Sequence, residues 1–484
     1  MSLQLAEPLV TQRELERALA EIIGAESVLA EGAELRVYDC DAYTVEKAAP
    51  SAIALPQTTE EVAAIVKLCN RIRVPFVPRG AGTGLAGGTT AVCGGVVIST
   101  VRMNRILDVD IPNRRLTAQA GCVNIRLSKA VAAEGLHYAP DPSSQGACTV
   151  GGNVSENSGG PHTLKYGVTT NHVTGLKMVM PDGEIAKLGG DVDYPPGYDL
   201  VGLVVGSEGT FGVVTEVTVR LTPLPQAYRT LLGVFETVDD CTQTVSDIIA
   251  AGILPGALEM IDQLILQAIE DAFHFGYPRD AKAVLIIELD GFEAGLDEDA
   301  ERVQEICRKN NAREVRLAAT AEDRARLWIA RKKGIGAAGR LAPSIVTQDG
   351  VIPRSKLPEV LREIGDISVR YGIRICNIFH AGDGNLHPCI LFDERDPDEL
   401  RRVTEAGEEI LKLCVRVGGS ITGEHGIGLE KIDAMSLLFS EADIALMERI
   451  RAVFNRNELC NPGKLFPTAK SCVEVKWRPR AAYV

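Results

Sequence analysis

The chain has 484 residues, 45% of them hydrophobic, and a net charge of −14 from 51 basic and 65 acidic side chains. This length predicts more than one domain, and the hydrophobic content is sufficient for folded cores. The acidic balance disfavours nucleic acid and anionic membrane surfaces as partners.

The N-terminal stretch contains charged residues such as Arg13 and Glu14 and lacks the basic flank and apolar run of a signal peptide. No run of about 18 apolar residues occurs, so we expect no membrane span. The 12 cysteines are scattered without a C-x-x-C pair. They predict buried thiols in a reducing compartment rather than an iron–sulfur cluster or a structural zinc site. We therefore expect a cytoplasmic protein that can associate with a membrane through partner subunits.

The first half of the chain predicts alternating strands and helices. Residues 58–73 predict a helix that begins with a capping box between Thr58 and Glu61. A second helix is predicted from a cap at Asn124 to Glu134. Strands are expected at 74–78, 95–100, 115–119, 175–179 and 213–221.

Pro223 and Pro225 mark a boundary, after which the pattern changes. Apolar runs that predict strands alternate with longer helical patterns. The strands are expected at 231–235, 283–289 and 373–379, and the helices at 296–309 and 397–417. The whole pattern predicts an α+β protein with a glycine-rich first lobe and a more helical second lobe.

The first glycine cluster, residues 78–90, reads PRGAGTGLAGGTT. Gly82, Gly84 and Gly87 satisfy the G-x-G-x-x-G fingerprint of a Rossmann nucleotide site, but that site requires a helix directly after the glycines. The residues that follow are β-branched and predict a turn and a strand. A backbone nest for a pyrophosphate fits this pattern better, and a loop without function is the third alternative.

Two further clusters follow. Residues 140–160 read PDPSSQGACTVGGNVSENSGG, and residues 206–214 read GSEGTFGVV. Small, hydroxyl-bearing and amide residues at this density predict a backbone that lies against a flat ring and a ribityl–phosphate chain.

These three clusters, in this order, resemble the FAD-binding domain of the vanillyl-alcohol oxidase (PCMH-type) superfamily. The sequence beyond Pro223 is similar to the FAD-linked oxidase C-terminal domain, and the resemblance is strongest to the D-2-hydroxy acid dehydrogenase branch. It implies an α+β fold with an FAD-binding domain of two α/β subdomains at 1–222. It also implies a cap domain at 223–455, with an antiparallel sheet flanked by helices, and a C-terminal segment at 456–484 that returns to the FAD domain.

The resemblance assigns the first cluster to the pyrophosphate, the second to the ring and ribityl chain, and the third to the adenine side of FAD. The residues implied are Pro78, Gly80, Ala81, Gly82, Thr83, Gly84, Leu85, Asp141, Ser144, Thr149, Gly152, Asn153, Asn157, Ser158, Glu208, Gly209, Val213, Val214 and Asn461. Some members of the superfamily attach FAD to a histidine in the first loop, where this chain has Thr83. We therefore expect FAD to be bound without a covalent link.

Three of the seven histidines lie in two glycine-rich loops, FHAGDGNLHP and GGSITGEHGIGL. A lone histidine in a loop is usually solvated, but two such loops together favour a functional site. His380, His387 and Glu424 form a two-histidine, one-carboxylate set, which leaves positions open on a divalent ion such as Zn²⁺. In an extended backbone Glu424 and His425 point in different directions, so one can bind the ion while the other faces the substrate.

This arrangement suits a 2-hydroxy acid, which can chelate an ion through its hydroxyl and one carboxylate oxygen. His425 is expected to take the hydroxyl proton while the hydride passes to flavin N5. The resemblance to metal-dependent D-2-hydroxy acid dehydrogenases implies the same division of roles. Asn385 is expected to hydrogen-bond the hydroxyl or the carboxylate of the substrate.

A carboxylate substrate also requires a cation with a bidentate geometry. Arg331 lies where the family places a substrate arginine, although it could instead lie on a solvated helix face, and Arg340 is a second candidate. The enzymes that act on 2-hydroxyglutarate have a lysine where this chain has Thr347. The resemblance therefore argues against a second carboxylate on the substrate.

We predict FAD-dependent oxidation of a small D-2-hydroxy acid, with glycolate to glyoxylate first, D-lactate as the main alternative and D-2-hydroxyglutarate as a lesser one. The chain has no cysteine grouping for an iron–sulfur cluster to reoxidise the flavin. Resemblance to the glycolate-oxidising members implies a second FAD-domain subunit and an iron–sulfur subunit as partners.

A metal hydrolase and a flavin-bearing scaffold are the alternatives from other functional classes. A yellow protein would exclude the hydrolase, and the intact histidine set argues against the scaffold.

Overall fold

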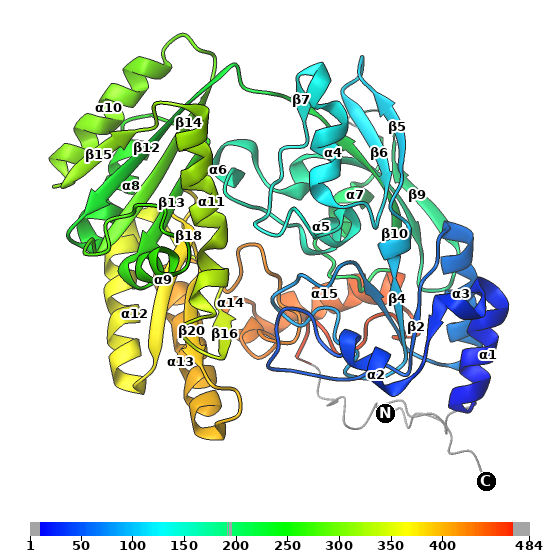
Figure 1. The fold of residues 1–484 in the computed structure, drawn as a ribbon. Coiled ribbons are helices and arrows are strands. Elements are labelled where there is room, and N and C mark those ends of the chain that lie inside the picture. Colours follow the sequence, from blue (N-terminus) through cyan, green and yellow to red (C-terminus); the bar gives the residue numbers. More distant parts are fainter. Residues whose placement is uncertain (1–9, 191, 193–195, 468–484) are drawn as a thin grey trace. The chain divides into compact units, whose positions relative to one another are not determined.

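The computed structural model describes residues 10–190, 192 and 196–467 (Figure 1). The described chain forms two compact units. The first unit comprises residues 10–158, 168–223 and 424–467, and the second comprises residues 159–167 and 224–423. The parts of the predicted domains at 1–9, 191, 193–195 and 468–484 lie outside the described residues.

The first unit contains two main sheets, each with its own helices, which confirms the predicted pair of α/β subdomains. One sheet is β1 (Val28–Leu29), β2 (Ala52–Ala54), β4 (Val96–Ser99) and β3 (Phe76–Arg79), in which the last three strands are parallel. The other, antiparallel, sheet is β5 (Ile106–Asp110), β6 (Arg115–Gln119), β10 (Val213–Arg220), β8 (Val173–Val179) and β9 (Ile185–Gly189). A small pair joins β7 (Leu136–His137) to β11 (Thr222–Pro223). The helices are α1 (Gln12–Ile23), α2 (Gly32–Leu35), α3 (Thr59–Ile72), α4 (Asn124–Val131), α5 (Val150–Glu156), α7 (Leu200–Val204), α14 (Met435–Leu438) and α15 (Glu441–Phe454).

Helix α3 begins at the predicted cap. The Thr58 side chain accepts a hydrogen bond from the Glu61 N–H at 3.1 Å, but the Glu61 carboxylate accepts from the Gln57 N–H, so only half of the predicted capping box forms. The cap predicted for α4 is wrong, because Val123 occupies the N-cap position. Asn124 is buried, and its Nδ2 donates to the Pro140 carbonyl at 3.1 Å.

The loop that joins β3 to the parallel strand β4 contains the first glycine cluster. It contains turns and bends and no helix, which confirms that the G-x-G-x-x-G pattern is not a Rossmann site. None of the described cysteines forms a disulfide and, apart from Cys40, they are buried as predicted. Cys472 lies outside the described residues.

The second unit is built on one antiparallel sheet flanked by helices, as predicted. Its main path is β15 (Glu314–Leu317), β12 (Ala227–Phe235), β14 (Ala283–Gly291), β13 (Ala257–Asp262), β18 (Arg374–His380), β19 (Asn385–Leu386) and β17 (Gly350–Val351). Strand β20 (Pro388–Phe392) pairs with β18 and with β16 (Ser344–Thr347). The helices are α6 (Thr163–Tyr166), α8 (Val238–Ala250), α9 (Gln263–Phe273), α10 (Leu296–Lys309), α11 (Ala321–Ala338), α12 (Leu357–Tyr371) and α13 (Pro397–Arg416).

Both faces of this sheet are covered, so the central strand β14 is buried along almost its full length. Val284 and Ile286 pack in one core with residues of α9 and α11. Their neighbours Leu285 and Ile287 point to the opposite face, where α8 and α10 pack (Figure 1). The sheet is therefore a rigid platform for the loop that follows β18.

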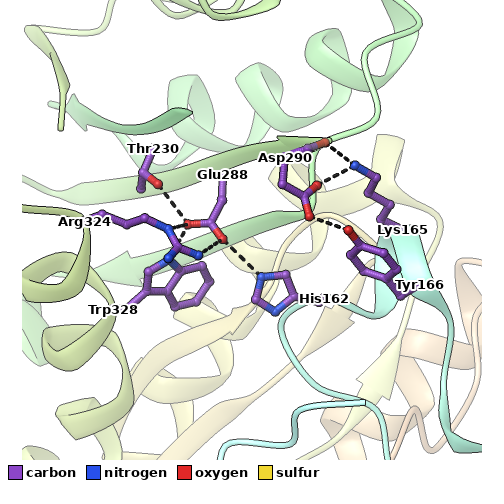
Figure 2. A network of polar contacts seen from close by, with 8 residues as sticks. All are labelled: His162, Lys165, Tyr166, Thr230, Glu288, Asp290, Arg324 and Trp328. Atoms are coloured by element: carbon purple, nitrogen blue, oxygen red, sulfur yellow. Dashed lines mark hydrogen bonds and ion pairs between the residues drawn. The ribbon is translucent and has the colours of Figure 1, made fainter. Parts of the chain in front are cut away.

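Segment 159–167, which follows the second glycine cluster, packs in the second unit through buried carboxylates. Glu288 accepts hydrogen bonds from both Arg324 Nε and Nη2 at 2.7 Å, from Trp328 Nε1 at 2.6 Å and from Thr230 Oγ1 at 2.8 Å, and it lies 3.3 Å from His162 Nε2. Asp290 accepts from Lys165 Nζ and from the Tyr166 hydroxyl. Figure 2 shows these residues converging from the segment, two strands and α11.

The chain re-enters the first unit at Glu424 rather than at the predicted start of the C-terminal segment, residue 456. The reason is that α15 packs in the first unit, where the Phe454 ring stacks on Phe211 with centroids 4.4 Å apart. None of the described helices is both long enough and apolar enough to cross a bilayer.

Candidate functional site

In the first unit, the three glycine clusters border one cleft. Its lining consists of Pro78, Arg79, Gly80, Gly88, Thr89, Thr100, Gly151, Gly152, Ser155, Glu156, Glu208, Gly209, Val213 and Val214. The predicted cofactor residues among them are Pro78, Gly80, Gly152, Glu208, Gly209, Val213 and Val214. The remaining predicted cofactor residues lie in or beside the same loops and do not line this cleft.

Three polar lining residues, Arg79, Ser155 and Glu156, lie within the predicted clusters but are absent from the predicted set of cofactor residues. Arg79 ends β3 directly before the glycines, and its Nη1 donates to the Cys40 carbonyl and to Thr89 Oγ1. Ser155 and Glu156 lie one turn after Gly151 in α5. Helical spacing from the glycines could have identified this pair, because residues three or four apart share a helix face.

The backbone of the first cluster at Gly80 lies directly against the Thr149 side chain of the second cluster. A Cβ atom at Gly80 would lie 2.2 Å from Thr149 Oγ1. Thr149 cannot easily turn away, because it is the N-cap of α5 and its hydroxyl accepts from the Gly152 N–H. The approach of these two loops therefore depends on glycine at position 80.

The third cluster is joined to two later segments of the first unit. The Glu208 carboxylate accepts from the backbone N–H groups of Ile427 at 2.7 Å and Gly428 at 2.6 Å. Asn461 Nδ2 donates to the carbonyls of Gly88 and Glu208 at 3.0 and 2.8 Å. Glu208 thus holds the backbone just beyond His425, and Asn461 ties the first cluster to the third.

Two carboxyl groups, Glu156 and Glu208, lie in the wall of the cleft. Burial raises the pKa of Glu156 well above its ordinary value, and the charge of Glu208 raises it further. Burial also raises the pKa of Glu208, whereas the two backbone N–H groups oppose that shift. This shift favours the neutral form of Glu156, which would lessen the negative charge of a wall that faces an anionic phosphate.

In the second unit, the loop after β18 brings two of the predicted histidines together. His380 ends β18 and His387 follows β19, and their ring centroids are 5.1 Å apart with the rings nearly perpendicular. Both side chains are buried, at 3% and 5% exposure. Two imidazoles this close can offer nitrogen atoms to one ion.

A carboxylate that the sequence did not indicate, Glu259, lies beside His380. Its Oε1 is 2.7 Å from His380 Nδ1, and its Oε2 accepts from Arg331 Nε at 2.7 Å. Arg331 is only 3% exposed, so it does not lie on the solvated helix face considered above. The predicted substrate arginine and the predicted metal ligand therefore share one buried carboxylate.

His387 also has a carboxylate neighbour, Asp349, whose Oδ1 lies 3.5 Å from His387 Nε2. Asp349 is fully buried and accepts from the Thr422 hydroxyl at 2.6 Å and the Gly423 N–H at 2.9 Å. Asn385 is 5% exposed, and its Oδ1 finds no hydrogen-bond partner within the described chain. This oxygen is available to accept a hydrogen bond from a substrate hydroxyl.

Three other predicted site residues remain: Glu424, His425 and Arg340. Glu424 and His425 belong to the first unit and directly follow Gly423, the last residue of the second unit. Arg340 is exposed on the turn after α11, where it interacts with Asp271 at the surface. The structure therefore does not include Arg340 in the buried group of His380, Arg331 and Glu259.

Comparisons with known proteins identify the family. Residues 224–465 match the model of the FAD linked oxidases, C-terminal domain, and residues 50–189 match the FAD binding domain. The glycolate oxidase subunit GlcD of Escherichia coli (strain K12) is 47% identical over 94% of this chain and 92% of its own length. This chain belongs to the FAD-linked oxidase family.

Other relatives agree with that membership. The glycolate oxidase subunit GlcD of Bacillus subtilis (strain 168) is 42% identical over 94% of this chain and 97% of its own length. A D-lactate dehydrogenase of Archaeoglobus fulgidus is 34% identical over 85% of this chain and 90% of its own. The predicted family, the FAD-binding domain and the class of flavin-dependent oxidoreductase are confirmed.

The solved structure of p-cresol methylhydroxylase with substrate bound has the same fold. It gives a TM-score of 0.78 at 18% identity, over 93% of this chain and 96% of that chain. This likeness confirms the predicted PCMH-type architecture, and at this identity it shows the fold alone.

The residues of this FAD-linked oxidase fit the two bound groups that the sequence predicts, which are FAD and a divalent ion. Glycines 80, 88, 151, 152 and 209 line the cleft, and glycine-rich backbone of this kind is typical of sites that bind phosphate. In the second unit, the buried imidazoles of His380 and His387 each lie beside a carboxylate, an arrangement typical of metal-binding histidines.

Replacing Gly80 by alanine should weaken FAD binding by about 10-fold or more, because the new methyl group must push Thr149 and its loop apart. The measurement is FAD retention after dialysis, together with flavin titration of the apoprotein. Gly32→Ala is the matched control in the first unit, since Gly32 lies outside the three glycine clusters and a Cβ there has no heavy atom within 4 Å. Equal FAD affinity in the two variants would contradict this role of Gly80.

Proposed function

We propose that this FAD-linked oxidase oxidises a small D-2-hydroxy acid, with glycolate to glyoxylate as the first candidate reaction. The observation that carries the proposal is the buried group in the second unit, where a histidine pair lies beside an arginine that is held by a carboxylate. The relatives at 47% and 42% identity are glycolate oxidase subunits, and this supports glycolate. The D-lactate dehydrogenases at 34% identity make D-lactate the second candidate.

The proposed roles follow from the donor groups that the second unit contains. His380 and His387, together with Glu424, would hold a divalent ion such as Zn²⁺. Such an ion, when bound, lowers the pKa of a coordinated hydroxyl. Glu424 is covalently next to Gly423, whose N–H is bonded to Asp349. Chain connectivity thus keeps the third ligand close to the carboxylate beside His387.

The substrate would be held by two side chains. The Arg331 fork is bonded to Glu259 through Nε, which leaves its Nη groups to pair with the substrate carboxylate. The unpaired Asn385 Oδ1 would accept from the substrate hydroxyl. His425 would then take the hydroxyl proton as the general base while the hydride leaves carbon for the flavin N5.

FAD is proposed to bind without a covalent link, because the first loop has Thr83 where other members attach the flavin to histidine. The relatives at 47% and 42% identity are named as subunits, and this supports partner chains for the present protein. The proposed partners are a second FAD-domain subunit and an iron–sulfur subunit, which would receive the electrons. We propose that the chain is cytoplasmic and reaches a membrane only through these partners.

The test is anaerobic mixing of the FAD-loaded chain with glycolate, D-lactate, L-lactate and D-2-hydroxyglutarate, followed by the bleaching of flavin absorption. Glycolate should reduce the flavin fastest, and L-lactate should not reduce it. Fastest bleaching by D-lactate would favour the second candidate. Fastest bleaching by L-lactate, or no bleaching with any of the four, would overturn the proposal.

A further inference from the structure

Glu259 is fully buried, and each of its two carboxylate oxygens bonds a different side chain of the proposed site. Oε1 lies 2.7 Å from His380 Nδ1, and Oε2 accepts from Arg331 Nε at the same distance. One side chain therefore contacts both a proposed ligand of the ion and the proposed cation for the substrate.

The strand register explains why these groups meet. Glu259 on β13 is the direct cross-strand partner of His380 on β18, so their side chains share one face of the sheet. Helix α11 packs against α9 on the same side of the second unit and supplies Arg331. The bridge is thus built from two central strands and a helix, which are the rigid parts of this unit.

The hydrogen bond to His380 determines which ring nitrogen can bind an ion. With a carboxylate at Nδ1, that nitrogen holds the proton, and the lone pair lies on Nε2. The bond to Arg331 likewise fixes the guanidinium through Nε and leaves its Nη groups for a second carboxylate. Replacing a buried ion pair by apolar residues of similar size is often neutral for stability, so stability alone does not explain the Glu259–Arg331 pair and its bond to His380.

We infer that Glu259 is a positioning residue that sets the tautomer of His380 and the orientation of Arg331, and so couples binding of the ion to binding of the substrate carboxylate. This inference rests on the proposed function. Glu259 would then act only through His380 and Arg331, and not by binding the ion or the substrate itself.

Glu259→Gln tests the inference, because glutamine has only one acceptor oxygen and cannot accept from both His380 and Arg331. The side chain keeps nearly the same shape. In the FAD-loaded chain, the Zn²⁺ affinity measured by competition with a chelator should fall by about 10- to 100-fold. At saturating Zn²⁺, the KM for glycolate should stay raised by about 10-fold, since Arg331 has lost its anchor. At saturating Zn²⁺, the Glu259→Gln substitution should therefore change KM more than kcat.

Glu270→Gln is the matched control. Glu270 is also a buried carboxylate of the second unit, but it accepts from the backbone N–H groups of Gly276 and Tyr277 and contacts neither histidine nor Arg331. If Glu259→Gln fails to fold, the double variant Glu259→Gln/Arg331→Gln leaves no buried charge unpaired and preserves the Zn²⁺ measurement.

Wild-type Zn²⁺ affinity in the folded Glu259 variant, or equal losses in the two single variants, would overturn the inference. Failure of the proposed function gives a different result, because the wild-type chain itself would then reduce its flavin with none of the hydroxy acids. The difference in Zn²⁺ affinity between the wild type and the Glu259 variant would still decide the role of Glu259.

Discussion

Replacing His425 by alanine is expected to leave FAD bound and to slow flavin reduction by glycolate at least ~100-fold, the usual range for the loss of a general base. The backbone around His425 should survive the change, because it is fixed by other groups. The N–H groups of Ile427 and Gly428 are bonded to Glu208, and the Leu429 N–H donates to the Ala86 carbonyl at 2.7 Å. The alanine therefore removes an imidazole from a loop that stays in place. Stopped-flow absorbance without oxygen measures the rate.

The control for this variant is His274→Asn. His274 is exposed after α9 and has a φ of 55°, a conformation that asparagine tolerates better than alanine. It should reduce its flavin at the wild-type rate. Near-normal reduction in His425→Ala would remove His425 from the role of base, and loss of FAD from that variant would indicate a role in cofactor binding instead.

The features that could be predicted from the sequence are those that a local pattern determines. Periodicity and a cap residue place α3, and alternation places β10. The glycine clusters predict a nucleotide cleft because a crowded backbone position, such as Gly80 against the Thr149 side chain, restricts the residue type. The cap of α4 was wrong because Asn124 makes a long-range hydrogen bond that outweighs its local preference.

The features that could not be predicted depend on pairing between distant strands. Glu259 meets His380 only through the register of β13 with β18, and no spacing in the sequence encodes that register. Asp349 is likewise brought to His387 and Gly423 by long-range structure, because it lies in the turn between the short strands β16 and β17. The sequence therefore predicts the candidate ligands but not the buried carboxylates that orient them.

Replacing Glu288 by glutamine is expected to destabilise the second unit by about 3 kcal/mol, the lower end of the range for breaking a buried ion pair. The neutral amide leaves the Arg324 guanidinium without its bidentate partner (Figure 2). Trp328 is one of two tryptophans in the chain and donates to Glu288, so its fluorescence during urea unfolding reports on this network. The lower end applies because the Arg324 side chain is 34% exposed.

The pH dependence gives a second test of the same carboxylate. Burial alone would raise the pKa of Glu288, but the hydrogen bonds from His162 and Arg324 outweigh burial and lower this pKa from 4.5 to about 2. Since the folded-state pKa is lowered, the stabilisation is complete above pH 4.5 and is lost as the pH falls towards 2. Glu288→Gln should lack this part of the acid dependence.

Glu359→Gln, which removes an exposed pair with Lys356, should cost less than about 1 kcal/mol. Equal unfolding midpoints in the two variants would show that Glu288 does not hold segment 159–167 to the sheet.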